Sequence, residues 1–389
     1  MKNTEFNCGL TGSRRNSRGV SLVELMIAMV LGLLVTAGVL QLFSGQKLTH
    51  MTNEGLARVQ ENGRFAVETL KREFRGIGSS GFCAARTTIN NHLREDCAGY
   101  VNAAYDPNQP FTGWEFDGTG RNEDFDLDVI ETAGDNNWRS LQDGAVVTLP
   151  EVLADRVVKG SDVIIIRRPE VIPGLTAKNN NKANASSINL TGNNVLGKNA
   201  IVLVSNCSKS DLFQNRSNDS AAVYSSGSGT CDSPGPGNNN KVSFSTAYGD
   251  DMQIFRIRVF AFYIGINQDT GQPSLYRADM SRGVEEAFHE ELAEGVESLQ
   301  ILYGYSLPAD QGGDGQSVDF WVPADEVPDW GLTIGIRVAM LMRSPDRAGG
   351  APVQQTFDLA GARITHPSDN RMRRPFLTTV SLRNRQITL

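Results

Sequence analysis

One carboxylate lies inside the longest apolar stretch of the chain. Glu24 is the only ionisable side chain between Val20 and Phe43, a run of 24 residues. At about 1.5 Å per helical residue, this run is long enough to cross the hydrocarbon layer of a membrane. A carboxylate at the centre of a membrane helix costs on the order of 2.5 to 3.5 kcal/mol, so it is normally paired and functional. The sequence therefore predicts a cationic partner for Glu24.

Three interpretations of this segment compete. A secretory signal peptide cleaved after residues 35–37 (VTA) is disfavoured, because the apolar run continues to Phe43 and contains an acid. A simple signal anchor fits the length but gives Glu24 no role. The third interpretation is cleavage directly after Gly19. It also accounts for this glycine, which follows three arginines and stands immediately before the apolar run.

The stretch GVSLVELM at 19–26 resembles the processing site of type IV prepilins. In that family a dedicated peptidase cuts after the glycine, which implies cleavage between Gly19 and Val20 and N-methylation of Val20. Valine departs from the phenylalanine that is usual at this position. Cleavage creates a cationic amine within the bilayer, and the resemblance implies that Glu24 of a neighbouring helix neutralises it during assembly.

Charge predicts the orientation of the chain. The leader, residues 1–19, carries four basic side chains and one acidic side chain, which keeps it in the cytoplasm by the positive-inside rule. We therefore expect a single-pass inner-membrane protein whose C-terminal part lies in the periplasm before it enters the pilus. The remaining chain has 33 basic and 43 acidic side chains, a balance that does not favour a nucleic-acid partner.

Helical periodicity continues beyond the membrane segment. Apolar residues recur at steps near three or four from Leu48 to Ile77, no proline precedes Pro107, and glycines at 76 and 78 supply a stop signal. The pattern predicts one long helix from Val20 to about Arg75, docked on a globular domain by its second half. The expected divisions are the leader 1–19, an N-terminal helix 20–78 with its transmembrane part at 20–43, and a β-rich periplasmic domain 79–389.

Short β-rich runs follow. The strands expected from them cover residues 162–168, 200–206, 253–266, 298–305 and 333–343. Between them, the Asn/Ser/Gly-rich segments 178–194 and 208–240 predict mobile loops with little buried surface. The expected fold class is α+β: a long N-terminal helix packed on an antiparallel sheet with long loop insertions.

Other patterns with chemical potential carry weaker signals. The stretch GNNVLGKN at 192–199 approaches a phosphate-binding loop but precedes a predicted strand rather than a helix. The four histidines are scattered, and the acidic segments 117–128 and 310–319 do not match an EF-hand, although calcium binding there stays open. A basic cluster near the C-terminus, at positions 371, 373, 374, 383 and 385, leaves DNA contact as a minor hypothesis beside a solvated or acid-paired face. We predict no catalytic residue, cofactor or metal, and hence no enzyme.

Further blocks of sequence resemble the type IV pilus assembly protein PilW family. They lie at 61–82, 203–214, 291–304 and 373–385. The resemblance implies a pilin-like fold and a minor pilin that helps to initiate assembly at the pilus tip. The implied partners are other minor pilins, the major pilin, a tip adhesin, the prepilin peptidase, the inner-membrane assembly platform and membrane lipid. The alternative is the related pseudopilin J of type II secretion.

Cysteine parity predicts disulfides. Cys8 lies in the leader, which leaves Cys83, Cys97, Cys207 and Cys231 in the mature chain. An oxidising periplasm favours pairing, and four cysteines allow three connectivities. Proximity in sequence favours Cys83 with Cys97 and Cys207 with Cys231, each bond structural and closing a segment with little core of its own.

Overall fold

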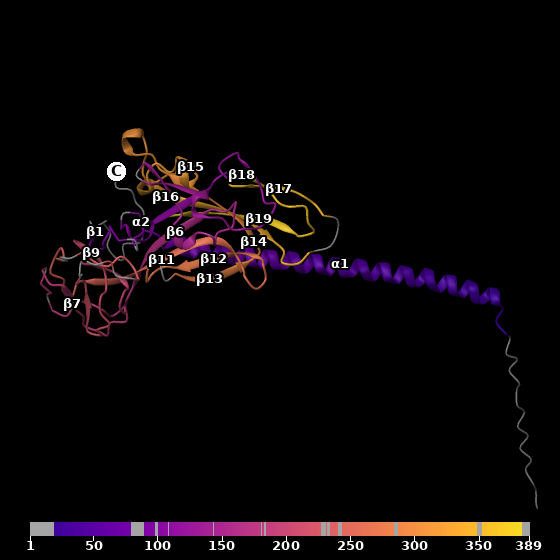
Figure 1. Cartoon of the computed structure of the whole chain (residues 1–389), viewed down its shortest axis with the longest axis horizontal. Helices are drawn as coiled ribbons and strands as arrows, with labels where there is room; N and C mark the ends of the chain where they lie inside the picture. Colours follow the sequence, from indigo (N-terminus) through magenta and orange to yellow (C-terminus); the bar gives the residue numbers. More distant parts are fainter. Residues whose placement is uncertain are drawn as a thin grey trace, which may run out of the picture. The chain divides into compact units, whose positions relative to one another are not determined.

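The computed structural model describes residues 19–78, 89–97, 100–107, 109–142, 144–179, 181–182, 184–226, 231, 234–239, 243–283, 287–347 and 352–382. Two compact units divide the chain, residues 1–51 and 52–389. The described parts contain one long helix and many strands, so the fold class is α+β (Figure 1). The leader up to residue 18 and Cys83 lie outside the described residues.

Helix α1 (Leu22–Arg75) is the long helix that the periodicity predicted. Within the first unit, its side chains are exposed, including Leu48 and Met51, which the apolar pattern had assigned to the docked face. Within the second unit, a stripe of the helix is buried. That stripe consists of Gly55, Val59, Gly63, Ala66, Thr69, Leu70, Glu73 and Phe74. Its spacing of three to four residues is that of one helical face.

After α1, the regular elements described in the second unit are mainly strands, with one short α-helix, α2 (Asn102–Tyr105). The strands that precede residue 230 are β1 (Ile89–Asn91), β2 (Phe111–Phe116), β3 (Asp124–Asp126), β4 (Trp138–Gln142), β5 (Ala145–Thr148), β6 (Val163–Val171), β7 (Ser187–Asn189), β8 (Ile201–Ser205), β9 (Ser210–Gln214) and β10 (Ala222–Tyr224). The strands that follow are β11 (Gln253–Ile266), β12 (Pro273–Asp279), β13 (Phe288–Glu294), β14 (Val296–Tyr305), β15 (Phe320–Val322), β16 (Thr333–Arg343), β17 (Thr356–Leu359), β18 (Ala362–Thr365) and β19 (Arg373–Ser381). Strands β6, β8, β11, β14 and β16 are the five that the sequence predicted.

Two sheets dominate the second unit. In the described residues, the larger one has ten strands in the order β1-β9-β8-β11-β6-β2-β4-β5, with β12 and β13 branching from β11. The other has four strands in the order β15-β14-β16-β19. Most strand pairs are antiparallel, but β1 pairs with β9 and β18 pairs with β3 in parallel. The prediction of an antiparallel sheet is therefore wrong for these two pairs.

The main core joins the buried stripe of α1 to both sheets. Leu70 and Phe74 of the helix pack in one cluster with residues of β6, β11, β14 and β16. Phe74 meets Phe262 of β11 edge to face, with ring centroids 5.9 Å apart. The docking of the second half of α1 is thus a hydrophobic contact, as its amphipathic pattern indicated.

The Asn/Ser-rich segments are more ordered than their composition suggested. Strand β7 lies within 178–194, and β9 and β10 lie within 208–240. Together with β8 they surround a separate buried cluster that includes Ile188, Phe213, Val223, Phe244 and Tyr248. In Figure 1, β1, β7 and β9 gather at one end of the second unit, and β17, β18 and β19 lie towards the other. The two segments contribute only a few apolar residues to this core, and neighbouring segments supply the others.

Candidate processing and assembly site

The residues predicted for processing and assembly lie at the start of α1. Ser21 is the N-cap: Leu25 N–H donates to the Ser21 carbonyl, and the backbone N–H of Ser21 donates to Glu24 Oε2 at 3.0 Å. This is half of a capping box, in which an acid at the third helical position reaches back to the cap residue. The sequence signal for it, Ser-x-x-Glu before an apolar run, was missed in the sequence analysis. Glu24 therefore has an intrachain partner as well as a predicted intermolecular one.

Gly19 stands at the predicted cleavage point without a structural need for glycine. A Cβ atom added at Gly19 would meet no heavy atom within 4 Å, and its backbone is not in the left-handed region. Glycine is usually retained where a side chain would clash or where φ is positive. Since neither condition holds at Gly19, a requirement for glycine there has to come from another molecule. A peptidase that binds the segment in a narrow cleft is such a molecule.

The N-terminal part of α1 fits a membrane anchor by length and composition. Among the described residues, it is the one helix long and apolar enough to cross a membrane. The two threonines of this part, Thr36 and Thr49, donate their hydroxyls to the carbonyls four residues earlier, Gly32 and Gly45. Side-chain hydroxyls bonded in this way present no unsatisfied donor to an apolar environment.

A buried carboxylate anchors the other end of α1 to the larger sheet. Glu73 is 2% exposed, and its carboxylate lies 3.3 Å from Arg168 Nη2 and 3.7 Å from Arg277 Nη1. The guanidinium groups of Arg168, Arg258 and Arg277 also lie within 5.6 Å of the centroid of the Phe260 ring. Cation–π and ionic contacts together explain why arginines stand opposite each other in β6 and β11.

A second ionic network ties β19 to β14. Arg373 Nε and Nη2 lie 2.6 and 3.0 Å from the two oxygens of Glu297, and Arg373 also holds Asp369 at 2.6 Å. Burial alone would lower the pKa of Arg373, but the hydrogen bonds to Asp369 and Glu297 outweigh it and raise the pKa. Arg343 adds a third contact, 3.3 Å from Glu297. Arg373 therefore belongs to an acid-paired network, not to a free basic surface.

The other members of the C-terminal basic cluster differ from one another. Arg371 donates to the carbonyls of Ser344 and Pro345, whereas Arg374 is exposed. The remaining two arginines, at 383 and 385, lie outside the described residues. Of the described positions, Arg373 is thus acid-paired, Arg371 is bonded to backbone carbonyls and Arg374 is solvated, as a solvated or acid-paired face would have them.

A buried histidine–aspartate pair resembles part of a catalytic relay. His92 Nε2 lies 2.6 Å from Asp211 Oδ1, and Tyr248 and Ser245 donate their hydroxyls to Asp211 Oδ2. Burial alone would raise the pKa of Asp211, but these hydrogen bonds outweigh it and lower the pKa. A relay needs the serine to bond the histidine, whereas here Ser245 bonds the aspartate directly. The arrangement fastens the segment around β1 to β9.

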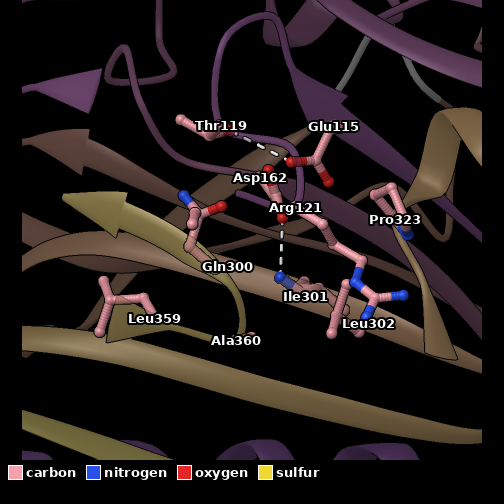
Figure 2. Close-up of a pocket in the computed structure, with 11 residues that line it drawn as sticks. Glu115, Thr119, Arg121, Asp162, Gln300, Ile301, Leu302, Pro323, Leu359 and Ala360 are labelled. Carbon is pink, nitrogen blue, oxygen red and sulfur yellow. Dashed lines mark hydrogen bonds between the residues drawn. The ribbon is translucent and has the colours of Figure 1, made fainter. Parts of the chain in front are cut away.

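Two carboxyl groups line a small cavity between the sheets (Figure 2). Glu115 and Asp162 are 5% and 1% exposed, and the cavity volume of about 10 Å³ is at the lower limit of what holds one water molecule. Burial raises the pKa of both groups, that of Asp162 to about 8, and nearby carboxylates raise the pKa of Glu115 further. Thr119 donates its hydroxyl to Glu115 at 3.2 Å. The pair is therefore protonated at a higher pH than isolated carboxyls.

Both oxygens of Asp162 are occupied by backbone donors. Phe116 N–H of β2 donates to Oδ1 at 3.2 Å, and Ile301 N–H of β14 donates to Oδ2 at 2.7 Å. Asp162 N–H donates in turn to the carbonyl of Leu299. Carboxyl pairs in acid–base enzymes keep one oxygen free for the substrate. Asp162 instead joins the larger sheet to the four-stranded sheet.

The structure contradicts the predicted disulfide pairing. Cys97 is bonded to Cys231 across 134 residues, not to Cys83. The reason is that the segment after β1 runs beside residues 237–239, where Leu93 bridges Asn238 and the Arg94 N–H donates to the carbonyl of Gly237. Cys207 is also disulfide-bonded, so its predicted bond with Cys231 is wrong too. The prediction from proximity in sequence fails because the segment after β1 pairs with residues 237–239, which brings distant cysteines together.

The remaining patterns are accounted for by local contacts. In the segment 117–128, Arg363 forms two hydrogen bonds with Asp124. In the segment 310–319, Asp314 accepts hydrogen bonds from Gln316 and Ser317 of its own turn. Within the described ranges, no group of three or more His, Cys, Asp or Glu side chains is arranged to hold a metal ion. The stretch 192–199 forms turns that lead into β8.

Comparison with known proteins yields two family matches. The model of type IV pilus-assembly protein W matches residues 261–384, which include β12 to β19, and the prokaryotic N-terminal methylation motif matches residues 14–40, which include Gly19, Val20 and Glu24. Comparisons with curated proteins and with solved structures found no match. The two matches confirm the resemblance to type IV pilus-assembly protein W and to the prepilin-type N-terminus, and they support a role related to the type IV pilus.

Proposed function

We propose that the chain is a minor pilin, cut after Gly19, that helps to initiate a type IV pilus and is built into it near the tip. The observation that carries the proposal is the segment from Gly19 to Glu24. A glycine without an intrachain role, a helix cap and a carboxylate stand together at the start of an apolar helix. Before assembly, this helix stores the protein in the inner membrane, with the second unit in the periplasm.

Glu24 has two roles in this proposal. In the stored subunit its carboxylate caps α1 through the Ser21 N–H. Cleavage makes Val20, the residue before Ser21, the new N-terminus with a free α-amine. In the filament, the Glu24 carboxylate neutralises the α-amine of Val20 in a neighbouring subunit. The partners are therefore other pilins, minor and major, and the adhesin that a tip complex carries. A dedicated peptidase and the inner-membrane platform act on the chain earlier.

The role is structural rather than enzymatic. The buried groups that resemble catalytic pairs, Asp211 and Asp162, have their oxygens engaged by hydrogen bonds within the fold. The match to a pilus-assembly family supports a pilus over a type II secretion pseudopilus. A pilin-like fold, with the N-terminal helix packed on a sheet, agrees with the buried stripe of α1 and its contacts with β11.

Intact mass of the membrane-extracted chain tests the proposal. Gly19→Leu is expected to leave the full-length precursor, because a bulky side chain at the cleavage point blocks the peptidase. Ala37→Leu is the matched control, since it would block a signal peptidase that cut after residue 37 but leaves Gly19 untouched. A mature chain that begins at Gly38, or a Gly19→Leu chain processed at the wild-type level, would contradict the proposal.

A further inference from the structure

The four-stranded sheet ends in a strand with one free side. Its order places β19 at the edge, and among the described residues no strand pairs with β19 on the side away from β16. The pairing between β19 and β16 runs over nine residue pairs without a shift in register. A long, regular edge presents a row of unpaired backbone groups and is a template for another strand.

Two hydrogen bonds at its ends define which groups of β19 face outward. Leu382 N–H donates to the Ile334 carbonyl, and Ser344 N–H donates to the Met372 carbonyl. In an antiparallel pair, the backbone N–H and C=O groups of every second residue bond the partner strand, and those of the residues between them point away from it. Even-numbered residues of β19 therefore bond β16, and odd-numbered residues face outward. The outward N–H groups after the proline are those of Leu377, Thr379 and Ser381.

The position of Pro375 agrees with this alternation. Proline has no N–H and is tolerated in a sheet only where that N–H would face away from the neighbouring strand. Pro375 is odd-numbered, so it leaves the pairing with β16 intact. It also limits the free edge to the part of β19 that follows it.

Among the described residues, the other long edge strand carries charges along its length, whereas β19 is protected only at its start, by Arg374 and Pro375. Strand β13, which pairs only with β12, carries three glutamates and a histidine and lies beside a register shift. The edge strands β1, β5 and β15 have at most four residues. By contrast, residues 375–381 of β19 contain no charged side chain, and Leu377 is 64% exposed. Charges, bulges and shortness are the usual protections of an edge.

The charges around β19 indicate the chemistry of a strand that would bind there. Arg374 is exposed at the start of the strand. An acidic side chain opposite it is therefore favourable, and β19 itself (RRPFLTTVS) contains no acidic residue, so a second copy of this strand cannot supply one. A strand that is uncharged opposite residues 375–381 and acidic opposite Arg374 matches this edge.

We propose that the outer edge of β19 binds an extended strand from a different pilus subunit, uncharged opposite Leu377–Ser381 and acidic opposite Arg374. Main-chain hydrogen bonds to the outward groups supply the affinity, and Arg374 selects the register. This inference rests on the proposed function, because it requires the chain to enter the pilus. Its test separates the two.

The test compares the pilus-bound fraction of full-length variants in cells that make pili. Thr379→Pro removes one outward N–H without touching the bonds to β16, and Thr379→Val is the control that loses the same hydroxyl but keeps the N–H. Because a missing donor leaves a partner carbonyl unpaired, we expect Thr379→Pro to lower the fraction about tenfold. Arg374→Glu lowers it as well, whereas Thr379→Val leaves it at the wild-type level.

Amide hydrogen exchange of the wild-type chain gives a measurement that does not depend on a variant. The N–H groups of Leu377, Thr379 and Ser381 exchange fast in the detergent-purified chain and become protected in isolated pili. Unchanged exchange in pili, or Thr379→Pro incorporated like wild type, overturns the strand-binding proposal while the minor-pilin proposal stands. Wild-type chain absent from pili overturns both. A dimer of the purified chain that Thr379→Pro abolishes identifies a second copy as the occupant and overturns the assignment.

Discussion

The buried network around Arg373 predicts a defined pattern of stability changes. The side chains of Arg373 and Glu297 are 1% and 0% exposed, and Asp369 is 19% exposed. Arg373→Met leaves Glu297 fully buried with Arg343 as its one remaining cation, 3.3 Å away. Removing one partner of a buried pair costs about 3–5 kcal/mol, and the remaining contact places this case near the lower end.

The double substitution distinguishes an unpaired charge from a lost contact. Glu297→Met together with Arg373→Met removes both charges, and replacing a buried pair by apolar side chains is often neutral. We therefore expect the double variant to be more stable than Arg373→Met alone. Arg374→Met is the matched control, because its exposed side chain contributes within about 0.5 kcal/mol.

Urea unfolding of the full-length chain in detergent, followed by tryptophan fluorescence, measures these free energies. If the double variant loses the sum of the two single losses, Arg373 and Glu297 do not act as a pair. A loss for Arg373→Met no larger than that for Arg374→Met would refute the burial argument altogether.

Three further predictions concern the carboxylates and the disulfides. Glu24→Gln keeps the acceptor for the Ser21 N–H but loses the charge, so we expect it to be processed normally and to enter pili as poorly as Glu24→Ala. The measurement is the fraction of each variant found in isolated pili. If the glutamine variant enters pili at the wild-type level, capping the helix is the only role left for Glu24. The raised pKa values of Glu115 and Asp162 mean that the folded chain binds protons more tightly than the unfolded chain, so their stabilisation is complete below pH 4 and declines as pH rises towards about 8. Glu115→Gln should make urea unfolding at pH 5 and pH 8 more alike than in wild type, and equal pH dependence would count against the pair. Non-reducing peptide mapping should find Cys97 linked to Cys231, and parity then assigns Cys83 to Cys207; a Cys83–Cys97 peptide would show the original local pairing instead.

Long patterns in the sequence predicted the elements that carry many repeats of one period. Helix α1 repeats its apolar positions over many turns, and β11 and β16 are strands of 14 and 11 residues that are rich in apolar side chains. Each added residue of such a segment strengthens the same periodic pattern, so both the type and the length of the secondary-structure element could be predicted. The processing segment was equally readable, because its residues lie within six positions of one another.

Short and nonlocal features could not be predicted in this way. Strands β7 and β10 have three residues each, within segments rich in asparagine and serine, and their burial depends on Phe244 and Tyr248 from further along the chain. The Cys97–Cys231 bond likewise depends on a pairing of two loops that no local pattern encodes. The composition of these segments correctly indicates low hydrophobicity, but a few apolar residues are enough for a small core when they come together in the fold.

The glycines of α1 differ in whether contacts within the chain require a residue without a side chain. In the second unit, a Cβ added at Gly63 would lie 2.4 Å from the ring of Phe376, so the close approach of helix and β19 requires glycine there. In the first unit, a Cβ added at Gly32, Gly38 or Gly45 would meet nothing within 4 Å. Each glycine inside a helix costs roughly 1 kcal/mol relative to alanine. The described chain offers no contact that requires glycine at these three positions, so close packing against neighbouring helices, as the proposed function implies, is what would offset this cost.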